Sequence, residues 1–320
     1  MDLKRGPGAA ADGRAGALEP RLSPVAVGRL AVLAAVAVWS TWLVATRYGV
    51  STTLAPLDVA MIRFAVSGAV LWPFLRRGGW GLRPGERLTT VVMVAGAGAP
   101  FFLIAAAGMR LAPTSHIAAL LPGTVPLFTA ILAAAFGGDR PDRGRLAGLA
   151  LIVVGIGLIG GPGLVGAASA GDWRGHGLLL LGATMWGGYI VAMRHKATGT
   201  WRAAAIVNVW SAVLLLPVYL LVAGGGLLDA PWRDVAIQAV VQGLLSGVVA
   251  MALFGVAVGR LGAARAAAFT ALLPVLATVL AIPLLGEVPD APSVAGIAAA
   301  SAGVLLAAGI AGASRLARGG

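Results

Sequence analysis

An internal repeat is the sequence feature that most constrains the fold. The segment from Arg110 to Gly148 returns half a chain later, beginning at Arg260. A single offset of 148 residues relates Pro126 to Pro274, Gly138 to Gly286, Asp139 to Glu287, Pro141 to Pro289, Gly148 to Gly296 and Gly155 to Gly303. The two arginines upstream need an offset of 150, so two residues were gained or lost between these markers. A match this long predicts two copies of one structural unit.

The composition places both copies in a membrane. The chain is 59% hydrophobic and only 11% charged, whereas soluble domains carry roughly 25% charged residues. Its net charge of +12 could suggest a nucleic-acid partner. However, the basic residues lie between apolar runs instead of gathering on one face, so we assign them to cytoplasmic loops and expect no nucleic acid. Cysteine is absent, which excludes disulfides and thiolate chemistry.

Ten apolar runs are long enough to cross the hydrocarbon core, which takes about 17 to 25 residues of helix. The expected fold is therefore an all-α integral membrane protein with ten transmembrane helices, as two five-helix repeats. The runs cover about 27–47, 56–75, 88–109, 113–136, 145–162, 176–194, 202–223, 234–258, 264–285 and 292–313.

The runs divide the chain into two repeats joined by a short linker. The first repeat covers 27–162 and the second covers 176–313, with an extracytoplasmic linker at 163–175. Residues 1–26 are rich in Gly, Pro and charge, which predicts a disordered cytoplasmic tail. A cleaved signal peptide is the competing interpretation of this tail. Residues 314–320 form a second cytoplasmic tail.

The distribution of Lys and Arg predicts the orientation. With the N-terminus inside, nineteen basic residues fall on the cytoplasmic side and four on the outer side, and Arg63 remains within a span. Cytoplasmic loops collect positive charge, so we expect a multi-pass protein of the cell membrane with both termini cytoplasmic. Because each repeat has an odd number of helices, the second must be inverted relative to the first. Inverted repeats are typical of secondary transporters that bind substrate near the midplane.

The order and spacing of several short motifs resemble the EamA-type members of the drug/metabolite transporter superfamily. The resemblance covers residues from about 27 to 313 and implies ten helices and transport, often export, of amino acids, other metabolites or drugs. In the second repeat no charged residue matches Arg63, and only Asn208 lies close by. The matching motifs are Trp39-Ser40, Trp186-Gly187, Ile62-Arg63-Phe64, Pro126, Pro274, Gly138-Asp139, Gly286-Glu287, Gly148 and Gly296.

Arg63 is the leading candidate for substrate binding. A charged side chain within a span is costly, so it should face protein or water. It could anchor a carboxylate or phosphate of the substrate. It could instead be structural, pairing with Asp58 or with loop carbonyls, because proteins that resemble this chain carry Arg here whatever their substrate.

Four aromatic residues share a three-residue spacing near the middle of the first helix of each repeat. They are Trp39 and Trp42 in one helix, and Trp186 and Tyr189 in the other. Interfacial aromatic residues would lie at helix ends. These four could line a cavity for apolar or cationic groups, or pack between helices.

The other candidates are one histidine and three amides. His116 could sense pH or couple proton movement, or could be a hydrogen-bonded histidine at a helix start. Asn208 and Gln242, with Gln238, could bind a polar solute or join helices to one another. All twelve acids lie in loops, tails or helix ends, so no carboxylate proton relay is expected.

The sequence argues against an enzyme. Gly155-Ile-Gly157-Leu-Ile-Gly160 spells a dinucleotide fingerprint, but it lies inside an apolar run, where helix packing is the better interpretation. Gly157 with Gly161, and Gly243 with Gly247, have the four-residue spacing of small residues that lets helices approach closely. No phosphate-binding loop or metalloprotease motif occurs, and we expect no cofactor or metal. We therefore expect a secondary transporter, an exporter of small metabolites, with a lipid-headgroup flippase or an intramembrane enzyme as alternatives. The substrate and oligomeric state are not encoded in any motif.

Overall fold

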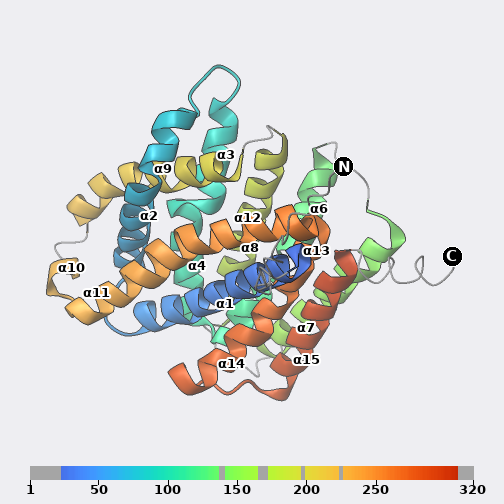
Figure 1. Cartoon of the computed structure of the whole chain (residues 1–320). Coiled ribbons are helices and arrows are strands. Elements are labelled where there is room, and N and C mark those ends of the chain that lie inside the picture. Colours follow the sequence, from blue (N-terminus) through green and yellow to red (C-terminus); the bar gives the residue numbers. More distant parts are fainter. Residues whose placement is uncertain (1–22, 137–140, 165–171, 196–198, 223–225, 309–320) are drawn as a thin grey trace, which may run out of the picture.

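The described part of the chain is helical throughout (Figure 1). The computed structural model describes residues 23–136, 141–164, 172–195, 199–222 and 226–308, and these residues include no strand. Both predicted tails lie almost entirely outside the described residues. Eight helical segments are long and apolar enough to cross a membrane, and the last helix, Ala291–Ala307, is apolar but shorter.

The expected runs correspond to helices, several of which are divided. The helices are α1 (Pro24–Ser51), α2 (Pro56–Gly78), α3 (Arg87–Ala97), α4 (Ala99–Leu111), α5 (Thr114–Leu120), α6 (Val125–Ala135), α7 (Arg143–Leu164), α8 (Asp172–His195), α9 (Thr200–Val222), α10 (Gly226–Asp229), α11 (Trp232–Gln238), a π-helical segment (Ala239–Val249), α12 (Ala250–Leu261), α13 (Ala263–Phe269), a 3₁₀ turn (Thr270–Leu272), α14 (Leu273–Leu285) and α15 (Ala291–Ala307). Helix α8 begins within the stretch that we expected to be a linker.

The third and fourth runs of each repeat are interrupted, which the apolar pattern did not predict. In the first repeat, Gly98 adopts an extended conformation between α3 and α4, and its neighbour Ala99 donates its N–H to the Ser211 hydroxyl at 2.9 Å. The third run of the second repeat contains the π-helical segment. In the fourth runs, the break between α5 and α6 and the 3₁₀ turn before α14 both precede the matched prolines Pro126 and Pro274. Proline lacks the N–H that would continue the helical ladder, so the repeat carries its own interruption.

Helices α7 and α15, the last of each repeat, lie against each other in opposite directions (Figure 1). A Cβ at Gly148 would meet Gly303, and a Cβ at Gly155 would meet Gly296. As one position number rises the other falls, so the two helices are antiparallel. Gly296 and Gly303 are the repeat partners of Gly148 and Gly155, so each glycine contacts the partner of the other. The expected packing role of Gly155 is therefore confirmed.

Three further helix contacts have the same exchange symmetry. Helix α1 packs against α12 and α14, and α8, the first helix of the second repeat, packs against α4 and α6. The second helices of the two repeats, α2 and α9, pack against each other. Exchanging the repeats therefore reproduces the same helix pairs, and a two-repeat architecture fits this arrangement.

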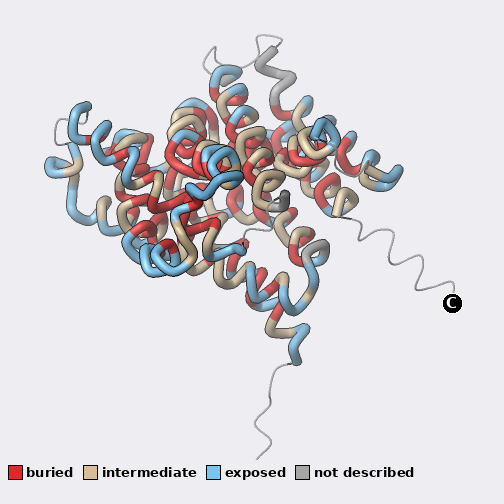
Figure 2. The backbone as a smooth tube through the Cα atoms, turned by 90° about the horizontal axis from the view of Figure 1, so that it is seen from above, coloured by how far each residue is buried: buried red, intermediate tan, exposed pale blue. Residues whose placement is uncertain are grey.

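Burial is strongest where the helices meet, and large apolar side chains remain exposed around the bundle (Figure 2). Phe64, Phe101 and Phe102 are among the largest fully buried side chains. In contrast, Leu221 on α9 is 85% exposed and Val279 on α14 is 56% exposed. A soluble monomer rarely exposes so much apolar surface, whereas lipid covers it at no cost.

Two opposite ends of the bundle are used as reference points below. The Glu287 end contains the connections 52–55, 112–113 and 286–290. Polar contacts of Arg47 and Glu287 join 286–290 to the end of α4 and the start of α5. The Glu86 end contains the connection 79–86 and the start of α9, which are joined by an ion pair between Glu86 and Arg202.

Candidate functional site

Arg63 projects from α2 toward the π-helical segment. Its Nη1 lies 3.3 Å from both the carbonyl oxygen and the side-chain oxygen of Gln242, and 3.2 Å from the Ser246 hydroxyl. Three rings surround the guanidinium, whose carbon lies 5.5 Å from the ring centre of Trp42, 5.6 Å from that of Phe102 and 5.8 Å from that of Phe64. Such rings attract a cation through their negative faces. All the contacts of Arg63 that the structure describes are therefore with neutral groups.

Asp58 does not neutralise Arg63. Its carboxylate accepts the Tyr219 hydroxyl at 2.8 Å and the N–H of Ala55 at 2.8 Å, which caps the start of α2. No ion pair to Arg63 occurs among the described residues. The alternative that Arg63 pairs with Asp58 is therefore wrong, because the first turn of α2 and helix α9 use both carboxylate oxygens. Arg63 carries a half-buried positive charge, and an anion would be complementary to it.

Close approach of α2 to the π-helical segment brings these groups together. The Ser67 hydroxyl, one turn after Arg63, donates to the carbonyl of Gly243 at 2.8 Å. A Cβ at Gly243 would collide with Val66, and one at Gly247 would collide with Ser67. The expected packing role of these two glycines is confirmed. Gln242 and Ser246 are four residues apart on the same segment, which places both against Arg63.

Trp42 adds an unused hydrogen-bond donor beside Arg63. The Trp42 side chain is only 7% exposed, and its buried indole Nε1 has no hydrogen-bond partner. Leaving a buried donor unpaired costs roughly 1–3 kcal/mol. The Gln242 amide nitrogen, by contrast, donates to the Thr46 hydroxyl at 2.7 Å and to the side-chain oxygen of Gln238 at 3.1 Å. Arg63 and Trp42 thus offer a cation and a neutral donor to an acceptor-rich group.

The structure brings three of the eight predicted site residues together, and four others lie among packed helices. Trp39 packs against Phe254 with ring centres 5.3 Å apart. Trp186 lies between Phe101 and Tyr189, at 5.0 and 6.1 Å. Their roles in substrate binding stay predictions.

The predicted amides outside the Arg63 cluster contact the backbone. Asn208 donates to the carbonyl of Ala204 in its own helix at 2.8 Å, and its buried side-chain oxygen has no partner. Gln238 donates across to the carbonyl of Ala45 at 2.7 Å, which joins the π-helical region to α1. Gln238 therefore links helices, as the second interpretation of these amides proposed.

His116 lies far from this cluster, at the Glu287 end. Its Nδ1 is 2.9 Å from Nε2 of His176, and its Nε2 is 2.9 Å from the Ser293 hydroxyl. Sequence reasoning gave His176 no role. The available signal was that both histidines stand within the first turns of helices that begin at the same side of the membrane. Among the described residues no group of three or more His, Asp or Glu is arranged to hold a metal ion.

Glu287 joins three elements at the same end. One carboxylate oxygen pairs with Arg47 Nε at 3.0 Å, and the other accepts the N–H of Thr114 at 2.6 Å. The Nη1 of Arg47 also donates to the carbonyls of Met109 and Arg110, at 2.8 and 3.0 Å. The repeat partner of Glu287, Asp139, lies outside the described residues.

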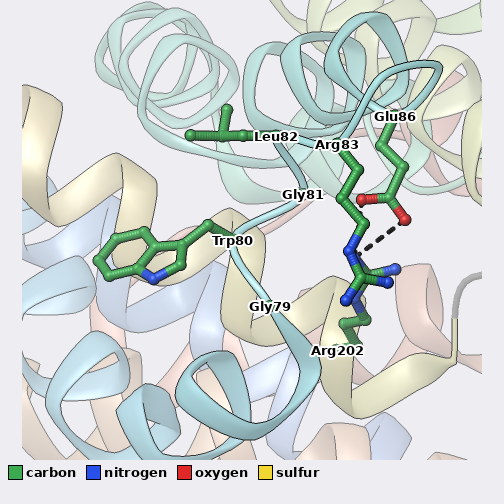
Figure 3. A pocket seen from close by; sticks show the side chains of 7 residues that line it. All are labelled: Gly79, Trp80, Gly81, Leu82, Arg83, Glu86 and Arg202. Carbon is green, nitrogen blue, oxygen red and sulfur yellow. Dashed lines mark hydrogen bonds and ion pairs between the residues drawn. The ribbon is translucent and has the colours of Figure 1, made fainter.

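The Glu86 end has a cavity of about 400 Å³ (Figure 3). At the wall of this cavity Arg202 pairs with Glu86 at 3.0 Å, and Trp210 donates its Nε1–H to the carbonyl of Trp80 at 3.0 Å. The Arg202 hydrogen bond is the main reason that the pKa of Glu86 lies below its usual value, and the positive charges of Arg202 and Arg83 add to this effect. The cavity is lined by Gly79, Trp80, Gly81, Leu82, Arg83, Glu86 and Arg202.

The family follows from a match that covers both repeats. The model of the EamA-like transporter family matches residues 26–161 and again residues 173–309. The chain belongs to the EamA-like transporter family. The expected membership is thereby confirmed, and this family is one of transporters. The two family matches cover the two halves of the chain that the offset of 148 residues relates.

Individual relatives agree with this membership. The chain is 32% identical over 190 residues to the "Probable terminal-alkyne amino-acid exporter" of Streptantibioticus cattleyicolor, a match over 59% of this EamA-like chain and 62% of that protein. The match thus spans less than two thirds of the relative. A crystal structure of a further protein superposes with a TM-score of 0.57 and 23% identity, covering 90% of this chain and 98% of that one, so the two share a fold.

Proposed function

We propose that this EamA-like protein is a secondary transporter that exports small metabolites bearing a carboxylate, by alternating access. Ten helices cross the cell membrane as two inverted repeats, and both termini are cytoplasmic. The antiparallel pairing of α7 with α15 and the exchanged helix contacts support this arrangement. Interrupted helices in both repeats support a central substrate site, because freed backbone groups are tolerated only where protein or water satisfies them.

The observation that carries the proposal is the Arg63 cluster. A guanidinium without a carboxylate partner among the described residues lies beside an unpaired indole N–H of Trp42. Arg63 can bind a carboxylate through two parallel hydrogen bonds, and the Trp42 donor can add a third. An α-amino acid presents such a carboxylate, and the named relative is described as an amino-acid exporter.

The aromatic rings around Arg63 indicate which substrate side chains would fit beside it. Phe64 and Phe102 lie edge to face, with ring centres 6.0 Å apart, next to the guanidinium. Both rings are fully buried in this structure, so an apolar substrate side chain would contact them in a conformation that opens the Arg63 cluster. We therefore favour amino acids with small apolar side chains over strongly polar solutes.

Transport in proteoliposomes tests this function. Efflux of a panel of radiolabelled neutral amino acids is compared with efflux of the matching amines that lack the carboxylate. Loss of one charge-assisted hydrogen bond costs about 1.5–3 kcal/mol, so Arg63→Ala should reduce efflux of the best amino acid about tenfold to a hundredfold. Arg76→Ala is the matched control, because Arg76 is exposed on the same helix.

Two results would count against the proposal. Equal efflux from Arg63→Ala and Arg76→Ala vesicles of equal protein content would reduce Arg63 to a structural role. Faster exposure of labelled lipid headgroups, without efflux of any amino acid, would instead favour a flippase on the same scaffold.

A further inference from the structure

Three helix starts meet in one chain of hydrogen bonds at the Glu287 end. His116 on α5 lies between His176 on α8 and Ser293 on α15, with a separation of 2.9 Å on each side. The N–H of Ser293 in turn binds the Asp290 carboxylate at 2.9 Å, which caps α15. Helix α5 belongs to the first repeat, and α8 and α15 belong to the second. The chain of hydrogen bonds therefore holds the two repeats together.

The contact between the two imidazoles depends on the number of protons that they hold. A hydrogen bond between ring nitrogens needs one N–H and one bare nitrogen. With both rings neutral, or with one extra proton between them, a bare nitrogen remains and the contact persists. With both rings protonated, all four nitrogens carry hydrogen, neither ring can accept, and two positive charges face each other at 2.9 Å. The second proton is therefore incompatible with this geometry.

The acidic groups near the pair can stabilise the positive charge that the first proton brings. Asp290 and Glu287 lie at this end, and the pKa of Asp290 lies below its usual value, chiefly because of its hydrogen bonds from Ser293 and to a smaller degree because of the charge of His116. The arginines on the neighbouring helices are occupied or exposed. Arg47 on α1 pairs with Glu287, Arg110 at the end of α4 is exposed, and Arg174 on α8 lies over the Trp173 ring at 5.5 Å.

The rings cannot separate by a small local movement of α8. His176 is only 8% exposed, and the neighbouring Gly175 is packed so closely that a Cβ there would meet Leu111 and the carbonyl of Gly108. A displaced His176 ring therefore has to carry the start of α8 away from α4 and α5. Repulsion within the pair acts on helix positions as well as on side-chain rotamers.

We propose that His116 and His176 form a proton-binding site, and that binding of the second proton separates α5 from α8 and opens the Glu287 end. Histidine is the side chain whose charge ordinarily changes between pH 5 and 8, so the separated rings bind the second proton in that range and opening increases as the pH falls through it. The proposal rests on alternating access and identifies protonation of the histidine pair as the event that opens the Glu287 end. If this end faces outward, acid outside the cell opens the transporter to that side.

Accessibility of a single cysteine measures the opening directly, because the chain has no cysteine of its own. The reporter is Thr114→Cys, whose side chain is fully buried at the Glu287 end and whose hydroxyl has no partner. Labelling by a water-soluble maleimide is followed from pH 8 to pH 5 in purified protein, without substrate. Each rate is divided by the rate of the same reporter with His116→Gln, which cancels the pH dependence of thiol chemistry.

The divided rate should rise toward pH 5, by up to about tenfold per pH unit for each proton that only the open state binds. The reporter that carries His176→Gln should not show this rise, because repulsion needs two imidazolium rings. It therefore serves as a second reference if His116→Gln fails to fold. A ratio that stays constant from pH 8 to pH 5 would overturn the proposal. Since no substrate is present, this outcome is distinct from failure of the Arg63 transport test.

Discussion

The two ends of the bundle differ in how they join the repeats. At the Glu287 end, the first repeat contacts the second through Arg47 and Glu287, through His116 and His176, and through Thr53 and Asp234, whose side chains are 2.7 Å apart. At the Glu86 end, the described cross-repeat polar contacts are the Glu86–Arg202 pair beside the cavity (Figure 3) and the bond from Trp210 Nε1–H to the carbonyl of Trp80.

This difference teaches that pseudo-symmetric helices need not give symmetric ends. The main helix pairs are exchanged between the repeats, as the glycines of α7 and α15 demonstrate. Among the described residues of the Glu86 end, no set of polar contacts is equivalent to that of Glu287 and the two histidines; Asp139, the repeat partner of Glu287, lies outside those residues. A transporter of this kind could therefore assign separate release signals to its two ends. We expect opening of the Glu287 end to depend on charge and protonation, and opening of the Glu86 end to depend mainly on packing.

The largest effect should follow from Glu287→Gln. This change leaves Arg47, with a side chain only 20% exposed, without its carboxylate and weakens the bond to the Thr114 N–H. Charge-assisted hydrogen bonds contribute about 1.5–3 kcal/mol each, so labelling of Thr114→Cys should rise about tenfold to a hundredfold. Glu86→Gln with the same reporter is the control. An equal rise in the control would mean that the two ends are not independent.

A smaller and equal effect should follow from the twin substitutions Gly148→Ala and Gly296→Ala. These glycines occupy matched positions at opposite ends of the α7–α15 pair, where an added methyl group would meet the facing helix. Each should reduce the free energy of unfolding by about 1–3 kcal/mol, as overpacking does. Thermal unfolding in detergent measures this, with Gly157→Ala as the control because no atom lies near its Cβ position. Unequal losses would disprove symmetric packing.

A weaker change is expected from Glu86→Gln at its own end. The reporter there is Ala203→Cys, a fully buried position next to Arg202. Both partners of the Glu86–Arg202 pair are partly exposed, and such pairs are screened by solvent and salt. Labelling should therefore increase less than it does at Thr114→Cys after Glu287→Gln. A larger increase would reverse the proposed ranking of the two ends.

The smallest effect concerns pH at the Glu86 end. The pKa of Glu86 is lowered in the folded protein, so its pair with Arg202 contributes fully above the ordinary glutamate value and is lost only as pH falls through the lowered value. Between pH 8 and pH 5, labelling of Ala203→Cys relative to the same reporter with Glu86→Gln should stay constant. A rise in this range would show that the proton response is not confined to the histidine pair.

The amino-acid sequence predicts the helices better than their interruptions. The expected run 56–75 became α2, Pro56–Gly78, because proline and glycine mark its limits. The close approach at Gly243 and Gly247 was also predictable from their spacing. The π-helical segment was not, since an apolar run gives the same signal whether its hydrogen bonds are α-helical or π-helical, and the contacts of Arg63 and Ser67 that accompany it lie about 180 residues away along the chain.

Site residues were predicted by type, but their partners were not. An arginine within a span, Arg63, and a mid-span tryptophan, Trp42, are visible in the sequence as unusual residues for a membrane helix. Whether Asp58 would neutralise Arg63 depended on Tyr219, which lies 161 residues away and accounts for one of its carboxylate oxygens. The link from His116 to His176 likewise depends on how α5 and α8 pack, which no local pattern reports.

The most direct test of the account asks on which side of the membrane the two repeat partners Asp139 and Glu287 lie. Single cysteines at these positions are labelled with a membrane-impermeant maleimide in intact cells and in inside-out vesicles. The account predicts that position 287 is labelled in intact cells and that position 139 is labelled only in inside-out vesicles. Labelling of both positions from the same side would contradict inverted repeats, and with them the proposed alternating access.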